Sequence, residues 1–216
     1  MQKAMKKTLF LLLPLVCLLS TTLFAQEFEI KNYNVKAAIK QETHTVEVQA
    51  KLRLVNLSGR ELVDKVLLAT TGKPRLSFYL HNKAKVTAMS VNNAAVEFRT
   101  GEALRLPLIT VATDITTSYA SAPEFDVEIS YSIPSTDRSQ TLHISPAESY
   151  ALPAGFWFPT YHNPFGVQQA DHGVDTAPFT LTVTAPGKII SSGVRTGDNV
   201  YEQTLAAQPF FFAGKY

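Results

Sequence analysis

The feature that most limits how this chain can fold is an alternation of apolar and polar residues with a period of two. It runs through Phe28–Ile39 and again through His44–Val55, with a short break at residues 40 to 43. Successive side chains of a strand point to opposite faces, so this alternation is typical of strands with one buried and one solvated face. The two segments therefore predict neighbouring strands joined by a short hairpin connection.

The same pattern recurs along most of the chain. Turn-forming residues such as Asn92-Asn93 and Gly197-Asp198-Asn199 separate the runs, and no stretch of helical length keeps an apolar period of 3.6 residues. Regular spacing of this kind predicts an all-β fold of about a dozen strands, arranged as an antiparallel β-sandwich. The further strands are expected at Leu62–Leu68, Arg75–Leu80, Val86–Val91, Ala95–Phe98, Leu104–Val111, Phe125–Ile133, Phe179–Thr184, Ile189–Gly193, Val200–Thr204 and Pro209–Ala213.

The first 25 residues have the pattern of a secretory signal peptide. Lysines at positions 3, 6 and 7 precede the apolar run Leu9–Leu19, and small residues lead to a cleavage point after Ala25. A membrane-spanning helix needs about 20 apolar residues, and this run is shorter and is interrupted by Pro14. We therefore expect cleavage near Ala25, a mature domain of residues 26–216 that is secreted or periplasmic, and no membrane association afterwards.

Cysteine usage and charge exclude several classes of protein. The only cysteine, Cys17, lies inside the signal, so the mature domain must fold by burial of apolar surface without disulfides. Without the three signal lysines, 17 basic residues remain against 18 acidic ones. This near-neutral balance predicts no nucleic-acid partner.

One stretch, residues 134–178, departs from the alternating pattern. It contains six of the twelve prolines, the only tryptophan and three of the five histidines, and we expect an irregular segment that meets another part of the protein. Large aromatic side chains either pack within the wider protein, which is the favoured interpretation, or contact a ligand. The interface candidates are Phe156, Trp157, Phe158, Tyr161 and Phe165.

Residues for catalysis or metal binding are not evident. His162, Asp171 and His172 are zinc-ligand types, but nine positions separate the first two, and the adjacent pair would point to opposite faces of an extended chain. No histidine begins an H-E-x-x-H motif, and no G-x-S-x-G motif is present. We therefore expect no catalytic, cofactor-binding or metal-binding residue, and no cofactor, on this chain.

Several fragments, in their order along the chain, resemble the N-terminal, non-catalytic domain of aminopeptidase N-like zinc metallopeptidases, the gluzincin aminopeptidases. The fragments are Tyr33-Asn34-Val35, Val46–Val55, Phe125–Tyr131, Phe156–Thr160, Phe179–Gly187, Ser191-Ser192-Gly193 and Pro209–Tyr216. The resemblance implies a saddle-like β-domain that forms one wall of a substrate groove. It also implies a thermolysin-like catalytic domain in the same polypeptide, which would carry the zinc and to which peptide substrate would bind beside this domain. The chain stops at Tyr216, where that catalytic domain would begin, so we expect a fragment of a longer peptidase.

The sequence departs from the family at its aromatic element. Many members have an Arg and an Asp beside the Phe-Pro pair and a Gln or Glu nearby, whereas Trp157–Pro164 has neither Arg nor Asp. No substrate-binding residue is therefore carried over. Two alternatives stay open: a free-standing extracytoplasmic binding module that uses the Phe156–Phe165 loop, and a domain of a pseudo-peptidase.

Overall fold

The computed structural model describes residues 28–57, 75–103, 108–120, 122–135, 139–161 and 175–215. Within these ranges the chain forms fifteen strands, two short 3-10 turns, η1 (Gln41–Thr43) and η2 (Pro153–Gly155), and the single-turn helix α3 (Thr117–Ala120). The strands are β1 (Phe28–Lys40), β2 (Thr45–Asn56), β3 (Arg75–His81), β4 (Lys85–Val91), β5 (Ala94–Ala95), β6 (Arg99–Glu102), β7 (Leu108–Asp114), β8 (Glu124–Pro134), β9 (Leu142–Ile144), β10 (Glu148–Ala151), β11 (Ala177–Thr184), β12 (Lys188–Ser191), β13 (Val194–Gly197), β14 (Val200–Ala207) and β15 (Phe211–Gly214).

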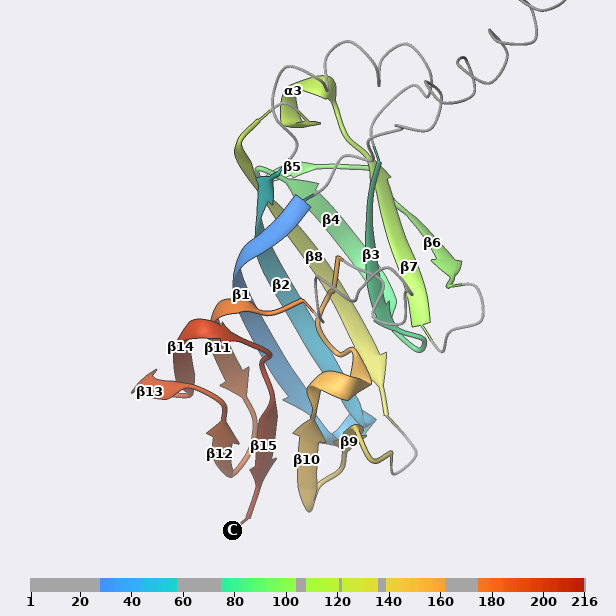
Figure 1. Ribbon diagram of the computed structural model, residues 1–216. Helices are drawn as coiled ribbons and strands as arrows, with labels where there is room; N and C mark the ends of the chain where they lie inside the picture. Colours follow the sequence, from blue (N-terminus) through green and yellow to red (C-terminus); the bar gives the residue numbers. More distant parts are fainter. Residues whose placement is uncertain are drawn as a thin grey trace, which may run out of the picture.

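These strands form three sheets (Figure 1). The large sheet has eight strands in the order β13-β14-β11-β1-β2-β8-β4-β5, a four-stranded sheet has the order β12-β15-β10-β9, and a three-stranded sheet has the order β3-β7-β6. The all-β prediction is confirmed. The pairing of neighbouring strands is antiparallel in the three sheets, with the exception of β1 and β11, which run parallel from Tyr33 opposite Phe179 to Ala38 opposite Thr184.

The large sheet has one buried and one exposed face, as the alternating sequence predicts. On β2, Val48, Ala50 and Leu52 are buried, whereas Glu47 and Gln49 between them point to the other face. The strands next to β2 show the same alternation, which continues in register across β1, β2 and β8. The exposed and buried faces therefore continue across the three central strands of the sheet.

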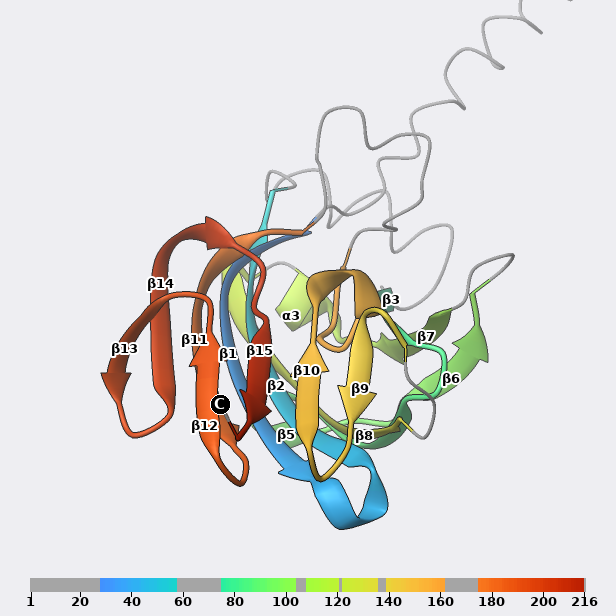
Figure 2. The same cartoon turned by 90° about the horizontal axis from the view of Figure 1, so that it is seen from below.

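Both small sheets cover the buried face. Buried apolar residues from all three sheets belong to one hydrophobic cluster, in which Phe78 of β3 and Phe211 of β15 join residues of the large sheet such as Tyr33 and Leu52. Seen from below, the four-stranded and three-stranded sheets lie side by side against the curved large sheet (Figure 2). Layers that bury one face of each sheet against another are a general solution for domains of this size.

Some strands differ from the predicted ones. The strands β9 and β10 lie inside the segment 134–178, which the sequence predicted to be irregular. They are three and four residues long, too short for a period-two pattern to stand out, and a Ser145 turn joins them through a hydrogen bond from its Oγ to the Glu148 carbonyl at 2.8 Å. Residues 99–102 form β6, although Thr100-Gly101 had the composition of a turn. The predicted strand Leu62–Leu68 and residues 104–107 lie outside the described residues.

The contribution of the Tyr131 hydroxyl on β8 to the stability of the core can be tested by substitution. The hydroxyl donates a buried hydrogen bond of 2.8 Å to the carbonyl of Trp157. We expect Tyr131→Phe to lower the free energy of unfolding by about 1–2 kcal/mol, because the bond is lost while the ring still fills its site. Urea denaturation at neutral pH measures this.

A matched control is Tyr79→Phe, because the Tyr79 hydroxyl on β3 makes no hydrogen bond within the described part of the chain. Its unfolding midpoint should stay close to that of the parent domain. If the two substitutions lower the free energy of unfolding equally, the hydrogen bond of Tyr131 does not contribute to stability.

Candidate functional site

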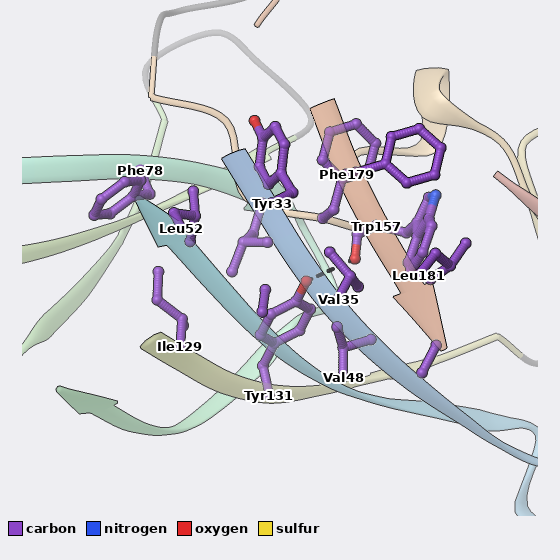
Figure 3. Close-up of a cluster of buried hydrophobic side chains, with 14 of the residues drawn as sticks. Tyr33, Val35, Val48, Leu52, Phe78, Ile129, Tyr131, Trp157, Phe179 and Leu181 are labelled. Carbon is purple, nitrogen blue, oxygen red and sulfur yellow. Dashed lines mark hydrogen bonds between the residues drawn. The ribbon is translucent and has the colours of Figure 1, made fainter. Parts of the chain in front are cut away.

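The aromatic segment, residues 156–161, lies between the three sheets. Trp157 and Phe158 are fully buried. The Trp157 ring meets Phe211 of β15 edge-on at a centroid distance of 5.2 Å, and the Phe158 ring meets Tyr33 of β1 at 5.6 Å. Figure 3 shows Trp157 among side chains that come from β1, β2, β8 and β11. Edge-to-face rings of this kind stabilise a core beyond the area they bury.

Hydrogen bonds from the large sheet hold the backbone of this segment. The Tyr131 hydroxyl donates to the Trp157 carbonyl (Figure 3), and the Tyr33 hydroxyl donates to the Pro159 carbonyl at 3.1 Å. Burial raises the pKa of both tyrosines well above the usual value, so both hydroxyls stay protonated and can donate. The Trp157 indole Nε1 in turn donates to the Pro209 carbonyl at 3.3 Å, just before β15.

The interface candidates therefore divide into three groups. Trp157 and Phe158 are core residues of this domain, so these two side chains pack within it. Because both rings are already buried by packing inside the domain, they have no free surface for a partner to contact. Phe156 and Tyr161 are partly exposed, and Tyr161 packs edge-on against rings of the core. Phe165 lies outside the described residues.

A different surface carries partly exposed aromatic side chains: the outer face of the four-stranded sheet. Four side chains lie directly opposite one another across its strands, in the order His143, Tyr150, Phe212 and Ile190, and we call them the outer row. Ring centroids are 5.6 Å apart for His143 and Tyr150 and 5.9 Å apart for Tyr150 and Phe212. Phe210 adds an edge-on contact to Phe212 at 5.9 Å. The outer row therefore forms a continuous apolar band across the sheet.

Sequence reasoning missed the outer row because it lies on strands that were predicted only in part. A signal was nevertheless present in Ser149-Tyr150-Ala151 and Phe211-Phe212-Ala213, where a large side chain stands between two neighbours that must face the opposite side. In the structure these neighbours are buried against the large sheet, while Tyr150 and Phe212 point outward.

The exposed face of the large sheet is polar, and its charges pair with one another. Arg53 binds Asp126 through two hydrogen bonds of 2.8 and 3.2 Å, and Lys51 reaches the same carboxylate at 2.9 Å. Gln49 donates to Glu128 at 2.6 Å. The hydrogen bond from Arg53, supported by Lys51, lowers the pKa of the Asp126 carboxyl below its usual value. This face is therefore suited to contact with water.

A shallow hollow of about 490 Å³ lies on the same face, beside Lys36 and Glu47 and the hydroxyls of Ser130, Ser132 and Thr182. These are hydrogen-bonding groups rather than a set that could ligate a metal. Across the described ranges, no three His, Cys, Asp or Glu side chains come together in a way that could hold a metal ion. His162, Asp171 and His172 lie outside those ranges. The helices of the described part are also too short or too polar to cross a membrane.

Comparison with solved structures gives the fold a context. The chain is similar to a yeast LTA4 hydrolase solved in complex with bestatin, with a TM-score of 0.64 and 15% identity, over 87% of this chain and 29% of that protein. It is also similar to an M1 zinc metallopeptidase from Deinococcus radiodurans, with a TM-score of 0.56 and 12% identity, over 87% of this chain and 42% of the metallopeptidase. For aminopeptidase A of Legionella pneumophila, solved with aspartic acid, the TM-score is 0.54 and the identity 10%, over 90% and 22% of the two chains.

These likenesses show the fold: the chain resembles one domain of M1 aminopeptidases. It spans less than half the length of each of these proteins. No protein-family model matches the sequence, and a search of curated proteins finds no match. The resemblance inferred from the order of sequence fragments is therefore matched by the arrangement of the strands in space.

The ion pair of Asp126 predicts how the stability of the domain depends on pH. Because the pKa of Asp126 is lowered on folding, the ion pair contributes stability above the unfolded pKa of about 3.9, and this is lost as the pH falls through the folded pKa. We expect Asp126→Asn to lower the free energy of unfolding at neutral pH by up to about 1 kcal/mol, the range for pairs near a surface. Urea denaturation of the variant should also show a smaller drop between about pH 5 and pH 3 than that of the parent.

The control is Asp198→Asn. Its carboxylate is fully exposed and lies 3.7 Å from Arg195, so its removal should change neither the stability nor its pH dependence measurably. The same pH profile in the parent and in Asp126→Asn would contradict a role for the Arg53–Asp126 pair.

Proposed function

We propose that this chain is the non-catalytic N-terminal domain of a secreted or periplasmic zinc aminopeptidase, and that it forms one wall of the groove in which peptide substrate lies. Peptide hydrolysis would be the work of a thermolysin-like catalytic domain in the same polypeptide. The observation that carries the proposal is the three-sheet architecture, which matches M1 aminopeptidases across about 87% of this chain but only 22–42% of theirs.

The chemistry of the chain supports a non-catalytic role. The sequence contains no H-E-x-x-H motif, the two-histidine arrangement that binds zinc on one helix face in such peptidases. Nor do the residues that the structure describes fit a zinc site, because they contain no cluster of three metal-ligating side chains. The zinc therefore belongs, in this proposal, to the catalytic domain, and no catalytic step is assigned to residues 28–215.

The start of the sequence supports the proposed location. Three lysines, the apolar run Leu9–Leu19 and the cleavage point after Ala25 are the parts of a secretory signal peptide. The absence of cysteine after Cys17 means that export to an oxidising compartment would place no disulfide in the domain. Stability then depends on the apolar core shared by the three sheets.

Enzyme assays test the proposal on two proteins, the mature chain 26–216 and the polypeptide encoded by the complete reading frame. We expect the complete polypeptide to hydrolyse aminoacyl anilides, to lose that activity with a chelator and to regain it with zinc. The mature chain alone should hydrolyse none of them. A reading frame that ends at Tyr216, or that continues without H-E-x-x-H, would overturn the peptidase assignment.

The wall of the groove has a separate test. The complete polypeptide is first treated with a chelator so that it does not hydrolyse the peptide. A bound peptide with a photoreactive side chain should then label residues between 28 and 215 as well as the catalytic domain. An excess of the unlabelled substrate peptide should reduce both labelling signals, since both come from the same bound state. Labelling confined to the catalytic domain would leave the peptidase assignment in place and refute the groove-wall role.

A further inference from the structure

The polar face of the large sheet has two parts, which differ in how their side chains are paired. In one part the charges bind one another, as where the Asp126 carboxylate binds both Arg53 and Lys51. The other part contains the hollow of about 490 Å³. We call it the hydroxyl hollow, after the Ser and Thr side chains of β4, β8 and β11 that line it: Thr87, Ser130, Ser132, Thr182 and Thr184.

The strand register arranges the lining of the hydroxyl hollow in two rows that cross the sheet. The first row consists of Thr182, Lys36, Gln49 and Ser130. The second row consists of Thr184, Ala38, Glu47 and Ser132. Neighbouring strands of a sheet lie about 4.8 Å apart. The rows therefore present hydrogen-bonding groups at a spacing close to that between hydroxyl groups on opposite sides of a hexose ring.

Short side chains and a β-bulge give the hollow its shape. Ala38 and Ser132 are short, so the second row lies lower than the long Lys36 side chain beside it. On β4 the register shifts between Val86 and Ala88, which leaves Thr87 as an extra residue. Its hydroxyl donates to the carbonyl of Ser130 at 3.1 Å. Bulges of this kind turn a side chain to a new direction and are frequent beside functional sites.

Most polar groups of the hydroxyl hollow have no partner within the described ranges. The hydroxyls of Ser130, Ser132, Thr182 and Thr184 make no hydrogen bond there, and the ammonium group of Lys36 makes no ion pair. Glu47 is different, because its carboxylate lies 3.6 Å from Lys40, in a pair of exposed side chains. Each hydroxyl both donates and accepts hydrogen bonds, so a ligand that satisfies the hollow must do the same.

Charge and size narrow the class of ligand further. Lys36 and Glu47 are the two charged side chains among the described residues that line the hollow, and their charges cancel. The hollow therefore favours neither anions nor cations. Its volume of about 490 Å³ lies within the range of about 300–1,000 Å³ that is usual for small-molecule sites. The methyl groups of Ala38 and the threonines offer contacts to the C–H groups of a sugar.

We infer that the hydroxyl hollow binds a short stretch of a neutral oligosaccharide. The Ser and Thr hydroxyls donate to and accept from the sugar hydroxyls, Lys36 donates to a sugar oxygen, and Glu47 accepts from a sugar hydroxyl. Tyr131, the aromatic residue of the lining, turns its own hydroxyl inward to the Trp157 carbonyl and provides no ring for stacking. Binding is therefore weak, with a dissociation constant of about 1 mM. The inference does not depend on the proposed function.

The test is a titration followed by NMR. The mature chain 26–216, labelled with nitrogen-15, is titrated with neutral hexasaccharides of glucose in both linkages, mannose, xylose and N-acetylglucosamine. At least one of these should shift the amide signals of residues 36–38, 47–49, 130–132 and 182–184 along a single binding curve. If none shifts them at about 10 mM, ten times the expected dissociation constant, the inference is overturned.

Two threonines of the same strand give a matched pair of variants. Thr182→Val keeps the shape of the side chain but removes its hydroxyl, so it should raise the dissociation constant about three- to tenfold through the loss of one hydrogen bond. Thr180→Val makes the same change on the same face of β11, outside the hollow, and should bind like the parent. Equal weakening by both variants would contradict binding in the hollow.

Filling the hollow is a second, independent change. Ala38→Leu should weaken binding more than tenfold, because the larger side chain occupies the space of the ligand. Its urea midpoint shows whether the variant is folded, and a folded variant that binds like the parent would overturn the inference. Inorganic phosphate and hexagalacturonate serve as charged probes. If they shift the same amides and the neutral hexasaccharides do not, the hollow is an anion site at Lys36, and the oligosaccharide assignment is wrong. None of these outcomes changes the test of the proposed function.

Discussion

The aromatic segment contacts all three sheets, and the arrangement of the described part of the domain depends on its position. From the large sheet, the hydroxyls of Tyr33 and Tyr131 bind its carbonyl oxygens. From the four-stranded sheet, Phe211 packs against the Trp157 ring. From the three-stranded sheet, β3 forms a two-bond antiparallel bridge to Thr160, with N···O distances of 2.8 and 3.1 Å. A segment bound from three sides fixes how the two small sheets lie on the large one.

That arrangement explains which parts of the fold can be predicted from sequence. The strands β1, β2 and β8 are long, so eleven or more residues of alternation show both the strand and its buried face. The strands β9, β10 and β15 have three or four residues, and their faces depend on what packs above them. Local pattern decides the large sheet, whereas tertiary contacts decide the small ones.

The aromatic residues show the same limit at the level of single side chains. Trp157 and Phe158 in a proline-rich segment have the composition of an exposed docking loop, and only the positions of Tyr33 and Tyr131 on distant strands show that the segment is buried. Phe212 is the reverse case. It lies within an apolar run that suggests a core strand, yet it points outward, because in a strand only every second residue can face the core.

The parallel pairing of β1 with β11 connects these observations. A parallel pair cannot be joined by a tight turn and needs a long crossover connection, and here the crossover contains β2 to β10. The crossover strands include β3, β7, β9 and β10, which cover the inner face of the large sheet. After β11 the chain returns through β14 to β15, which inserts between β10 and β12. The last strand therefore completes the cover of the core with Phe211 and, by the same alternation, turns Phe212 outward. Because one strand does both, its inner face is specified by the core of this domain, while the aromatic side chain on its outer face packs against Tyr150 of the neighbouring strand.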